Sequence, residues 1–442
     1  MQKKLKTYRG IQTAKAIKNF PFSFRTPKRE FIYAIVEIKK SAAIGHFLAG
    51  ELSRERKQAI VKTCDEILKG KYLTSFVLPG FQGGAGTSNH MNVNEVVALR
   101  ATEILGKGGK KRGINVHPND HVNMSHSTND VMPSALRISA LRMTDKLLFT
   151  LDNLILALEK KSKQFADIKK LGRTHMQDAV PITLGQEFSA YAEYMRRGKS
   201  RIKYTRELML EINLGGSAVG NSLNASPKYI SKLYPQLRKI TGLPFRSTKN
   251  LMAGTSSNTD FVALSQALTA LCVDLSKIAN DLRLLSSGPK GGLGEIALPT
   301  LQPGSSIMPG KVNPILPEAI NQLYFLVSGN NLTIEHAAEA SQLELGVMLP
   351  VTTDRLLESL KLMDELMEVF TKKCVSGIKA NPKRCRELLE NSLAYATVLS
   401  PVIGYDNVSN AVKYALANGK TLREVVILKK LLTPQKFDQL TK

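Results

Sequence analysis

The chain has 442 residues, of which 43% are hydrophobic and 22% charged, so it is long enough for two or three globular domains and is not a disordered chain. Its 62 Lys and Arg against 37 Asp and Glu give a net charge of +25. The basic residues are scattered, aromatic residues make up only 6%, and no zinc-finger spacing occurs, which disfavours nucleic-acid binding, whereas attraction of a small dianion fits the charge.

The cysteines indicate reduced thiols and therefore a cytoplasmic protein. They lie far apart and form no C-x-x-C pair, so neither a disulfide framework nor a zinc site is expected. No apolar run approaches eighteen residues, and we expect no membrane span. The four positions are Cys64, Cys272, Cys374 and Cys385.

The first part of the chain combines helical periodicity with a glycine-rich loop. A helical pattern with short breaks covers residues 31–69, and the loop at 80–88 (GFQGGAGTS) leads into a further predicted helix. This loop is not a dinucleotide-binding fingerprint, because no strand precedes it and the last glycine is lacking.

Two polar segments follow. Residues 117–130 (HPNDHVNMSHSTND) contain three histidines and two aspartates, but His117 and His121 have no cysteine or clear third ligand, so a metal site is disfavoured. Residues 172–181 (GRTHMQDAVP) precede a long predicted helix. Taken alone, His175 in this second segment could be a core histidine with satisfied hydrogen bonds.

The middle of the chain predicts a bundle of long helices. Apolar residues recur three and four apart without a miss from Phe261 to Leu285, which is typical of a bundle seam. No alternation of strands with helices is visible, so the fold class is predicted to be mainly α. Asn381-Pro382 marks a boundary, and we expect domains at 1–125, 126–380 (the bundle) and 381–442.

Residues 304–314 (GSSIMPGKVNP) are the most informative stretch. Gly304 and Gly310 allow a short loop to fold over a ligand, and Lys311 and Asn313 are suited to holding a carboxylate. The glycine-rich segment 288–294 just upstream is interpreted either as a mobile lid or as a plain connector.

These segments resemble the fumarase/aspartase superfamily. The match comprises four segments in the same order along the chain as in the family, namely 84–95, 117–130, 172–181 and 304–314. Weaker similarity continues to the C-terminus. The resemblance implies a three-domain, mainly α fold with a central long-helix bundle. It also implies a homotetramer, and a lyase that eliminates a group from the carbon beta to a carboxylate without metal or organic cofactor.

The resemblance also assigns roles to individual residues. It implies that Ser305 is the catalytic base, that His175 contacts a carboxylate partner matched by Glu318, and that Lys311 belongs to the catalytic set. The substrate-binding residues that it implies are Thr87, Ser127, Thr128, Asn129, Thr174, Lys311 and Asn313.

The reaction explains why these residue types are required. Removing a proton from the carbon next to a carboxylate places extra negative charge on that carboxylate, which preplaced donors and cations must stabilise. Serine is a poor base in water, so the anion of Ser305 would need backbone N–H groups and nearby positive charge.

Within the superfamily the chain resembles the aspartase branch more than the fumarases. Ser88, Thr128 and the proline Pro317 before Glu318 are aspartase-like, which predicts L-aspartate as the substrate in preference to L-malate. The hydroxyls of Thr87, Ser127 and Thr128 and the amide of Asn129 are then expected beside the substrate ammonium. Class II fumarate hydratase and a non-catalytic family member remain the alternatives.

Four departures from the branch pattern leave room for an altered substrate or low activity. His90 stands where the branch usually has asparagine, and His126 where it usually has glutamine. Residues 220–224 (GNSLN) replace a GTGLN pattern, and Gly346 stands where asparagine is common.

Overall fold

The computed structural model describes residues 6–111 and 114–441, which form two compact units. Unit 1 is drawn from three stretches of chain, namely Met1–Leu148, Gly198–Ala270 and Tyr324–Asp364. Unit 2 is drawn from the stretches between and after them, namely Phe149–Arg197, Leu271–Leu323 and Glu365–Lys442. The three-domain division at 1–125, 126–380 and 381–442 stays a prediction.

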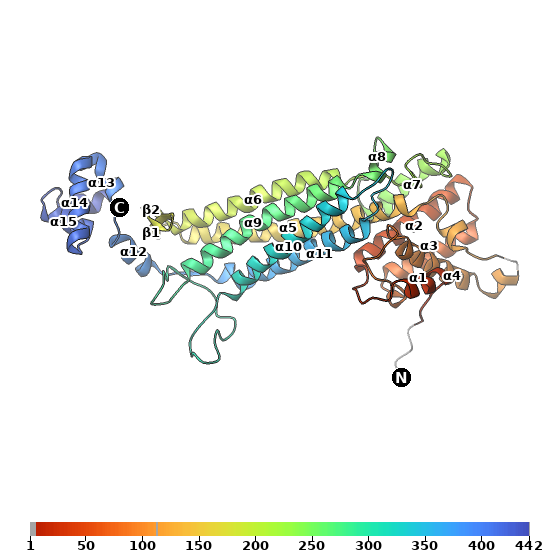
Figure 1. Ribbon diagram of the computed structural model, residues 1–442, viewed down its shortest axis with the longest axis horizontal. Coiled ribbons are helices and arrows are strands. Elements are labelled where there is room, and N and C mark those ends of the chain that lie inside the picture. Colours follow the sequence, from red (N-terminus) through yellow and green to blue (C-terminus); the bar gives the residue numbers. More distant parts are fainter. Residues whose placement is uncertain (1–5, 112–113, 442) are drawn as a thin grey trace. The chain divides into compact units, whose positions relative to one another are not determined.

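Long helices dominate the fold, which confirms the predicted mainly α class (Figure 1). Because each of them runs through a boundary between the two sets of stretches, each contributes one part to unit 1 and another to unit 2. The five are α5 (Thr128–Gln164), α6 (Leu184–Leu208), α9 (Thr259–Leu285), α10 (Ile315–Glu339) and α11 (Leu349–Lys373).

Helix α9 carries the predicted seam. The seam residues from Phe261 to Leu285 are all buried within the single chain. In unit 2, the Tyr191 hydroxyl of α6 donates to Asp281 of α9 at 2.9 Å. The seam is therefore covered by the chain's own helices.

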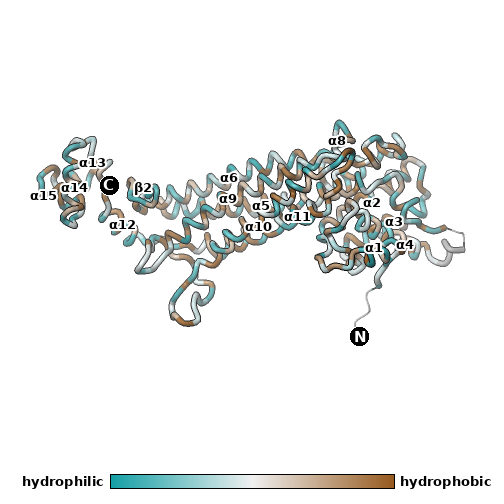
Figure 2. Tube along the Cα trace, viewed as in Figure 1, coloured by the Kyte–Doolittle hydropathy of each residue, from teal (hydrophilic) through white to brown (hydrophobic). Residues whose placement is uncertain are grey.

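Helix α9 also has the length and composition of a membrane span. Its most apolar 18-residue window has a mean hydropathy of 1.4, and 56% of that window is buried inside the protein. A core helix of a bundle meets the same criteria. Figure 2 shows hydrophilic and hydrophobic residues alternating along the labelled long helices, as packing on one face requires.

The remaining elements complete unit 1. His46 of α2 stacks on Tyr229 of α7, with ring centroids 3.6 Å apart. The pair β3 and β4 is parallel. The elements are α1 (Ile11–Asn19), α2 (Arg29–Ala49), α3 (Arg54–Leu68), α4 (Thr87–Lys111), α7 (Pro227–Thr241), α8 (Leu251–Ser256), β3 (Glu211–Ile212) and β4 (Arg246–Ser247), with short turns of helix at Leu73–Ser75 and Pro118–Val122.

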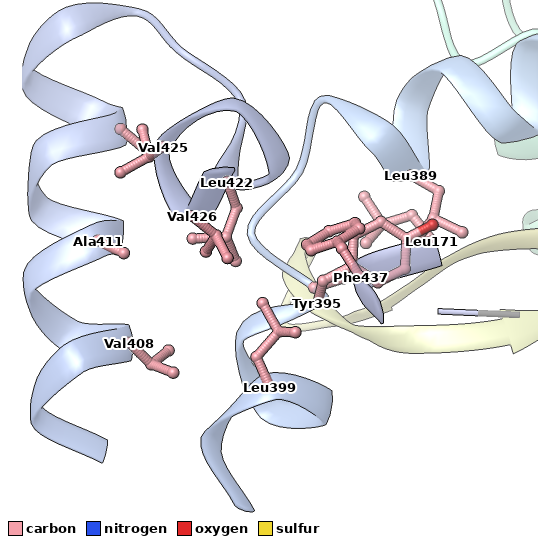
Figure 3. Close-up of a cluster of buried hydrophobic side chains, with 12 residues drawn as sticks. Leu171, Leu389, Tyr395, Leu399, Val408, Ala411, Leu422, Val425, Val426 and Phe437 are labelled. Carbon is pink, nitrogen blue, oxygen red and sulfur yellow. The ribbon is translucent and has the colours of Figure 1, made fainter. Parts of the chain in front are cut away.

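Unit 2 contains an antiparallel hairpin and a small helical core. Leu171 of the hairpin packs with apolar residues of the C-terminal helices, including Tyr395 and Phe437 (Figure 3). The elements are β1 (Lys169–Thr174), β2 (Gln177–Thr183), β5 (Ile296–Ala297), β6 (Lys379–Ala380), α12 (Pro382–Glu390), α13 (Ala396–Ile403), α14 (Tyr405–Asn418), α15 (Leu422–Leu428) and α16 (Pro434–Leu440), with one turn of helix at Val375–Gly377.

Candidate active site

The glycine-rich loop places Thr87 at the N-terminus of α4. Gly84 and Gly86 have φ angles of 84° and 91°, which glycine adopts without strain. A Cβ at Gly86 would also lie 2.6 Å from Met132 Cε, so a larger residue would require the Met132 side chain to move. Helix α4 begins at Thr87, whose side chain is exposed.

The segment Ser127–Asp130 starts α5 with reciprocal capping hydrogen bonds. Ser127 Oγ accepts from the backbone N–H of Asn129 at 3.2 Å, and Asp130 Oδ1 accepts from the N–H of Ser127 at 2.9 Å. Asp130 Oδ2 also accepts from the N–H groups of Gly215 and Ser217, at 3.0 and 3.2 Å. This buried carboxylate therefore fixes the start of α5 to the segment that follows β3.

Asn129 has a defined amide orientation. Its Nδ2 donates to the carbonyl of Ala218 at 2.8 Å, which leaves Oδ1 available as an acceptor for a ligand. Thr128 and Asn129 line one small pocket together with Thr255 and Asn258. Unit 1 thus brings together the N-termini of α4 and α5, whose helix dipoles and unpaired N–H groups favour a carboxylate.

A buried polar cluster lies behind this segment. Lys39 Nζ is 2.7 Å from Asn123 Oδ1 and 3.1 Å from His126 Nδ1, and His126 Nε2 is 2.8 Å from the Tyr229 hydroxyl. Burial lowers the pKa of Lys39 and raises that of Asp130. Burial, with the Lys39 charge, holds the pKa of His126 well below 6.5, so its ring is neutral.

The second unusual histidine, His90, joins the two helix N-termini. Its side chain is 1% exposed, and Nδ1 is 3.0 Å from Thr128 Oγ1. Both departures from the branch pattern in these loops are therefore buried hydrogen-bonding groups beside the predicted ligands.

In unit 2, Thr174 and His175 lie at the tip of the β1–β2 hairpin. Thr174 pairs with Gln177, and the two residues between them, His175 and Met176, have φ angles of 54° and 61°. Positive φ at both central residues defines a type I′ turn, which matches the strand twist. The turn leaves both Thr174 and His175 exposed.

An ion cluster that the sequence interpretation missed holds this hairpin. Glu295, which is 0% exposed, pairs with Lys170 and Arg173, each at 3.0 Å. Glu295 directly precedes β5, the strand that leads into the loop at 304–314, which we call the signature loop. The cluster therefore connects the hairpin to the start of that loop. No local pattern signals this pairing, because its members are more than 120 residues apart.

The signature loop contains the arrangement predicted for a serine base. Ser305 Oγ accepts from the backbone N–H groups of Ile307 at 3.2 Å and Met308 at 3.1 Å. The loop closes on itself: the Gly304 N–H donates to the Lys311 carbonyl at 2.9 Å, and Asn313 Nδ2 donates to the Gly304 carbonyl at 2.8 Å. Two N–H groups thus already converge on the Ser305 oxygen.

Lys311 joins two cavities on this loop. A cavity of about 360 Å³ is lined by Ser305 and Lys311, and one of about 580 Å³ by Lys311, Asn313 and Arg283. Lys311 is exposed, whereas Ser305 and Asn313 are half-buried. Both cavities are large enough for a small dicarboxylate.

Glu318 lies in the first turn of α10, beyond the loop, and is half-buried. Among the described residues of a single chain, no hydrogen bond or ion pair joins Glu318 to His175, so their predicted contact stays a prediction. Thr87 and 127–129 belong to unit 1, whereas 174–175, 305–313 and Glu318 belong to unit 2. Within the described residues, no group of three or more His, Cys, Asp or Glu is placed to hold a metal ion.

Comparison with known proteins identifies the family of the chain. The Lyase family model matches residues 1–329, and the family described as Fumarase C C-terminus matches 396–442. Aspartate ammonia-lyase of Bacillus sp is 44% identical over 435 residues, covering 98% of this chain and 92% of that protein. The class II fumarate hydratase of Helicobacter pylori strain J99 is 42% identical over 433 residues, covering 98% of this chain and 93% of that protein.

Solved structures show the same fold. The "fumarate lyase:delta crystallin" of Brucella melitensis, bound to cobalt, superposes with a TM-score of 0.94 at 44% identity, covering 99% of this chain and 95% of that chain. The class II fumarase of Schistosoma mansoni superposes with a TM-score of 0.93 at 37% identity, with the same coverage. The chain therefore belongs to the fumarase/aspartase superfamily of lyases, and its similarity to the aspartate ammonia-lyases supports the predicted carbon–nitrogen lyase.

Proposed function

We propose that the protein is an aspartate ammonia-lyase, which converts L-aspartate reversibly to fumarate and ammonia by anti elimination. The observation that carries this proposal is the pair of N–H groups that donate to Ser305 Oγ, in a loop that also presents Lys311 and Asn313. Donors already aimed at an oxygen stabilise its anion, which is what a serine base requires.

The proposed reaction has two steps. The Ser305 anion takes the proton from the carbon beta to the α-carboxylate, and the electron pair of the broken C–H bond moves onto the adjacent side-chain carboxylate. That dianionic carboxylate is stabilised by preplaced donors and cations. The electron pair then returns to form the carbon–carbon double bond as the C–N bond breaks. Ammonia leaves with the electron pair of the C–N bond. His175 and Glu318 are proposed members of the catalytic set through the family resemblance.

The choice of aspartate over malate depends on the leaving-group end of the site. Overall sequence identity does not decide the choice, because the aspartate ammonia-lyase and the fumarate hydratase compared above differ by only two percentage points in their identity to this chain. The orientation of Asn129 supports aspartate, since Oδ1 is an acceptor and suits the three donors of an ammonium group. The aspartase-like residues Ser88, Thr128 and Pro317 support the same choice.

We propose that the site is completed in a cytoplasmic homotetramer, in which unit 1 of one chain meets unit 2 of others. The large apolar residues that are exposed on α10 support an interface there. Phe325, Leu326 and Leu332 are 63%, 57% and 54% exposed, although α10 is a bundle helix. Substrate binding then uses Thr87 and 127–129 from one chain, and Thr174, Lys311 and Asn313 from others.

Mixing inactive variants tests this assembly. Thr87→Val in unit 1 and Ser305→Ala in unit 2 should each abolish turnover, and their coexpression should restore about a quarter of the sites if the two units of a site come from different chains. The matched control is Thr87→Val with Thr87→Ala, both in unit 1, which should restore nothing. An inactive first mixture would show that one chain supplies both units of each site.

Turnover assays test the activity itself. Fumarate formation is followed by its ultraviolet absorbance with L-aspartate and L-malate separately, together with ammonia detection. Ser305→Ala should abolish turnover while substrate still binds, because a base acts on the barrier more than on ground-state binding. Fumarate from malate alone would identify a hydratase, and binding without turnover of either substrate would identify a non-catalytic member.

A further inference from the structure

His90 is held in place between the two helix N-termini of unit 1. Its backbone N–H donates to the Gly86 carbonyl at 3.0 Å, and its side chain is buried against the start of α5. Nδ1 lies 3.0 Å from Thr128 Oγ1, whereas the buried Nε2 has no hydrogen-bond partner among the described residues. One ring nitrogen is therefore paired and the other is not.

The ring is neutral and thus carries a single N–H. Burial, assisted by the charge of Lys39, holds the pKa of His90 well below 6.5. If the hydrogen were on Nε2, a buried N–H would be left without an acceptor, which is rare in native proteins. With the hydrogen on Nδ1, only a lone pair is unpaired on Nε2, and Nδ1–H donates to Thr128. The second arrangement costs less free energy.

The direction of this hydrogen bond determines what Thr128 can offer a ligand. When Oγ1 accepts from His90, the hydroxyl hydrogen of Thr128 is directed elsewhere, and Thr128 lines the pocket that it shares with Asn129. Accepting from His90 uses one of the two lone pairs of Oγ1 and leaves the hydroxyl hydrogen free, and that hydrogen suits a carboxylate oxygen, which only accepts. This differs from the sequence-based expectation, which placed the Thr128 hydroxyl beside the ammonium.

We propose that His90 is a positioning residue: it donates Nδ1–H to Thr128 and thereby fixes the Thr128 hydroxyl as a hydrogen-bond donor to a substrate carboxylate. The proposal rests on the proposed function, because it takes Thr128 to contact the substrate. Asn129, whose Oδ1 is an acceptor, then serves the ammonium, so neighbouring residues contact opposite ends of the substrate.

Substitutions at His90 test the role of the Nδ1 donor. An asparagine amide nitrogen can occupy the place of Nδ1, so His90→Asn should keep kcat/KM for aspartate within about threefold. His90→Leu keeps an apolar filling without a donor and should lose about tenfold in kcat/KM. The effect must act through Thr128, so in a Thr128→Val background the change from His90→Asn to His90→Leu should alter kcat/KM less than twofold.

A direct spectroscopic measurement does not depend on turnover. In protein labelled with ¹⁵N-histidine, the His90 signals are assigned by their loss in His90→Asn, and Nδ1 should appear protonated and Nε2 bare from pH 6 to 8. A protonated Nε2 would overturn the proposal, as would equal activities of the Asn and Leu variants or additive effects in the Thr128→Val background. If the wild type turns over malate and not aspartate, the proposed function fails, and the same variants assayed with malate still decide the role of His90.

Discussion

Replacing Ser305 by cysteine would turn the signature loop into a reporter of its own electrostatics. A thiolate at this position would accept the N–H groups of Ile307 and Met308, which now donate to the serine oxygen at 3.2 and 3.1 Å. Hydrogen bonds to a charged group are each worth about 1.5–3 kcal/mol when buried, and one pKa unit corresponds to about 1.4 kcal/mol. Since the loop is half-exposed, we expect the pKa of the new thiol to fall by about one to two units, from about 8.5 to about 7.

The native cysteines give this measurement a clean background. All four are buried, and burial raises the pKa of each thiol to about 12. The assay is the rate of alkylation as a function of pH. The matched control is Ser306→Cys, because Ser306 is exposed and no backbone N–H among the described residues donates to its hydroxyl. A pKa for the Ser305→Cys thiol equal to or above that of the control would refute the proposed stabilisation of the base.

The remaining predictions concern Lys311, Asp130 and His126. Lys311→Ala should raise KM and lower kcat for aspartate in steady-state assays, because its ammonium faces a carboxylate in both the bound and the transition state, and a change in kcat alone would contradict this role. Asp130→Asn should destabilise the protein by about 2–4 kcal/mol, measured as a fall in Tm, because an amide cannot accept all three N–H groups and removes the negative charge that favours the charged form of buried Lys39. The exposed Asp406→Asn should change stability by less than about 0.5 kcal/mol. His126 is neutral in the folded protein, but in the unfolded protein it gains a proton once the pH falls below about 6.5. Its contribution to the free energy of unfolding is therefore complete above that pH and is lost at lower pH, by about 1.4 kcal/mol per pH unit. The Tm of His126→Gln should therefore fall less between pH 7.5 and 5.5 than that of the wild type, and equal falls would contradict the neutral buried ring.

The fold was predictable because its signals are local and periodic. The seam from Phe261 to Leu285 recurs at helical spacing over the whole of α9, and the absence of alternating strands excluded a doubly wound sheet. The loop that contains Ser305 was identifiable mainly through its resemblance to the superfamily, because its residue types alone indicated only that Lys311 and Asn313 could hold a carboxylate. By contrast, nothing in the sequence indicated that the chain's own helices would cover the seam.

The parts of the site that depend on distant residues were not predictable. Glu295 is 122 residues from Arg173 along the chain, so nothing in either local sequence indicated their ion pair. His90 and His126 were recognised only as unusual. Their hydrogen-bond partners Thr128, Lys39 and Tyr229 lie on three different helices that are distant in the sequence. The direction of these hydrogen bonds depends on which side chains are buried, and the sequence does not show this.

The measurement that tests the proposed activity most directly starts from fumarate, the product that aspartate and malate share. The protein is incubated with fumarate and ammonium in D₂O, and ¹H NMR detects both candidate products in one sample. We predict L-aspartate carrying a single deuterium at Cβ, with the coupling constant of anti addition, and no malate above the enzyme-free control. Formation of malate without aspartate, or no reaction, would contradict the assignment as an aspartate ammonia-lyase.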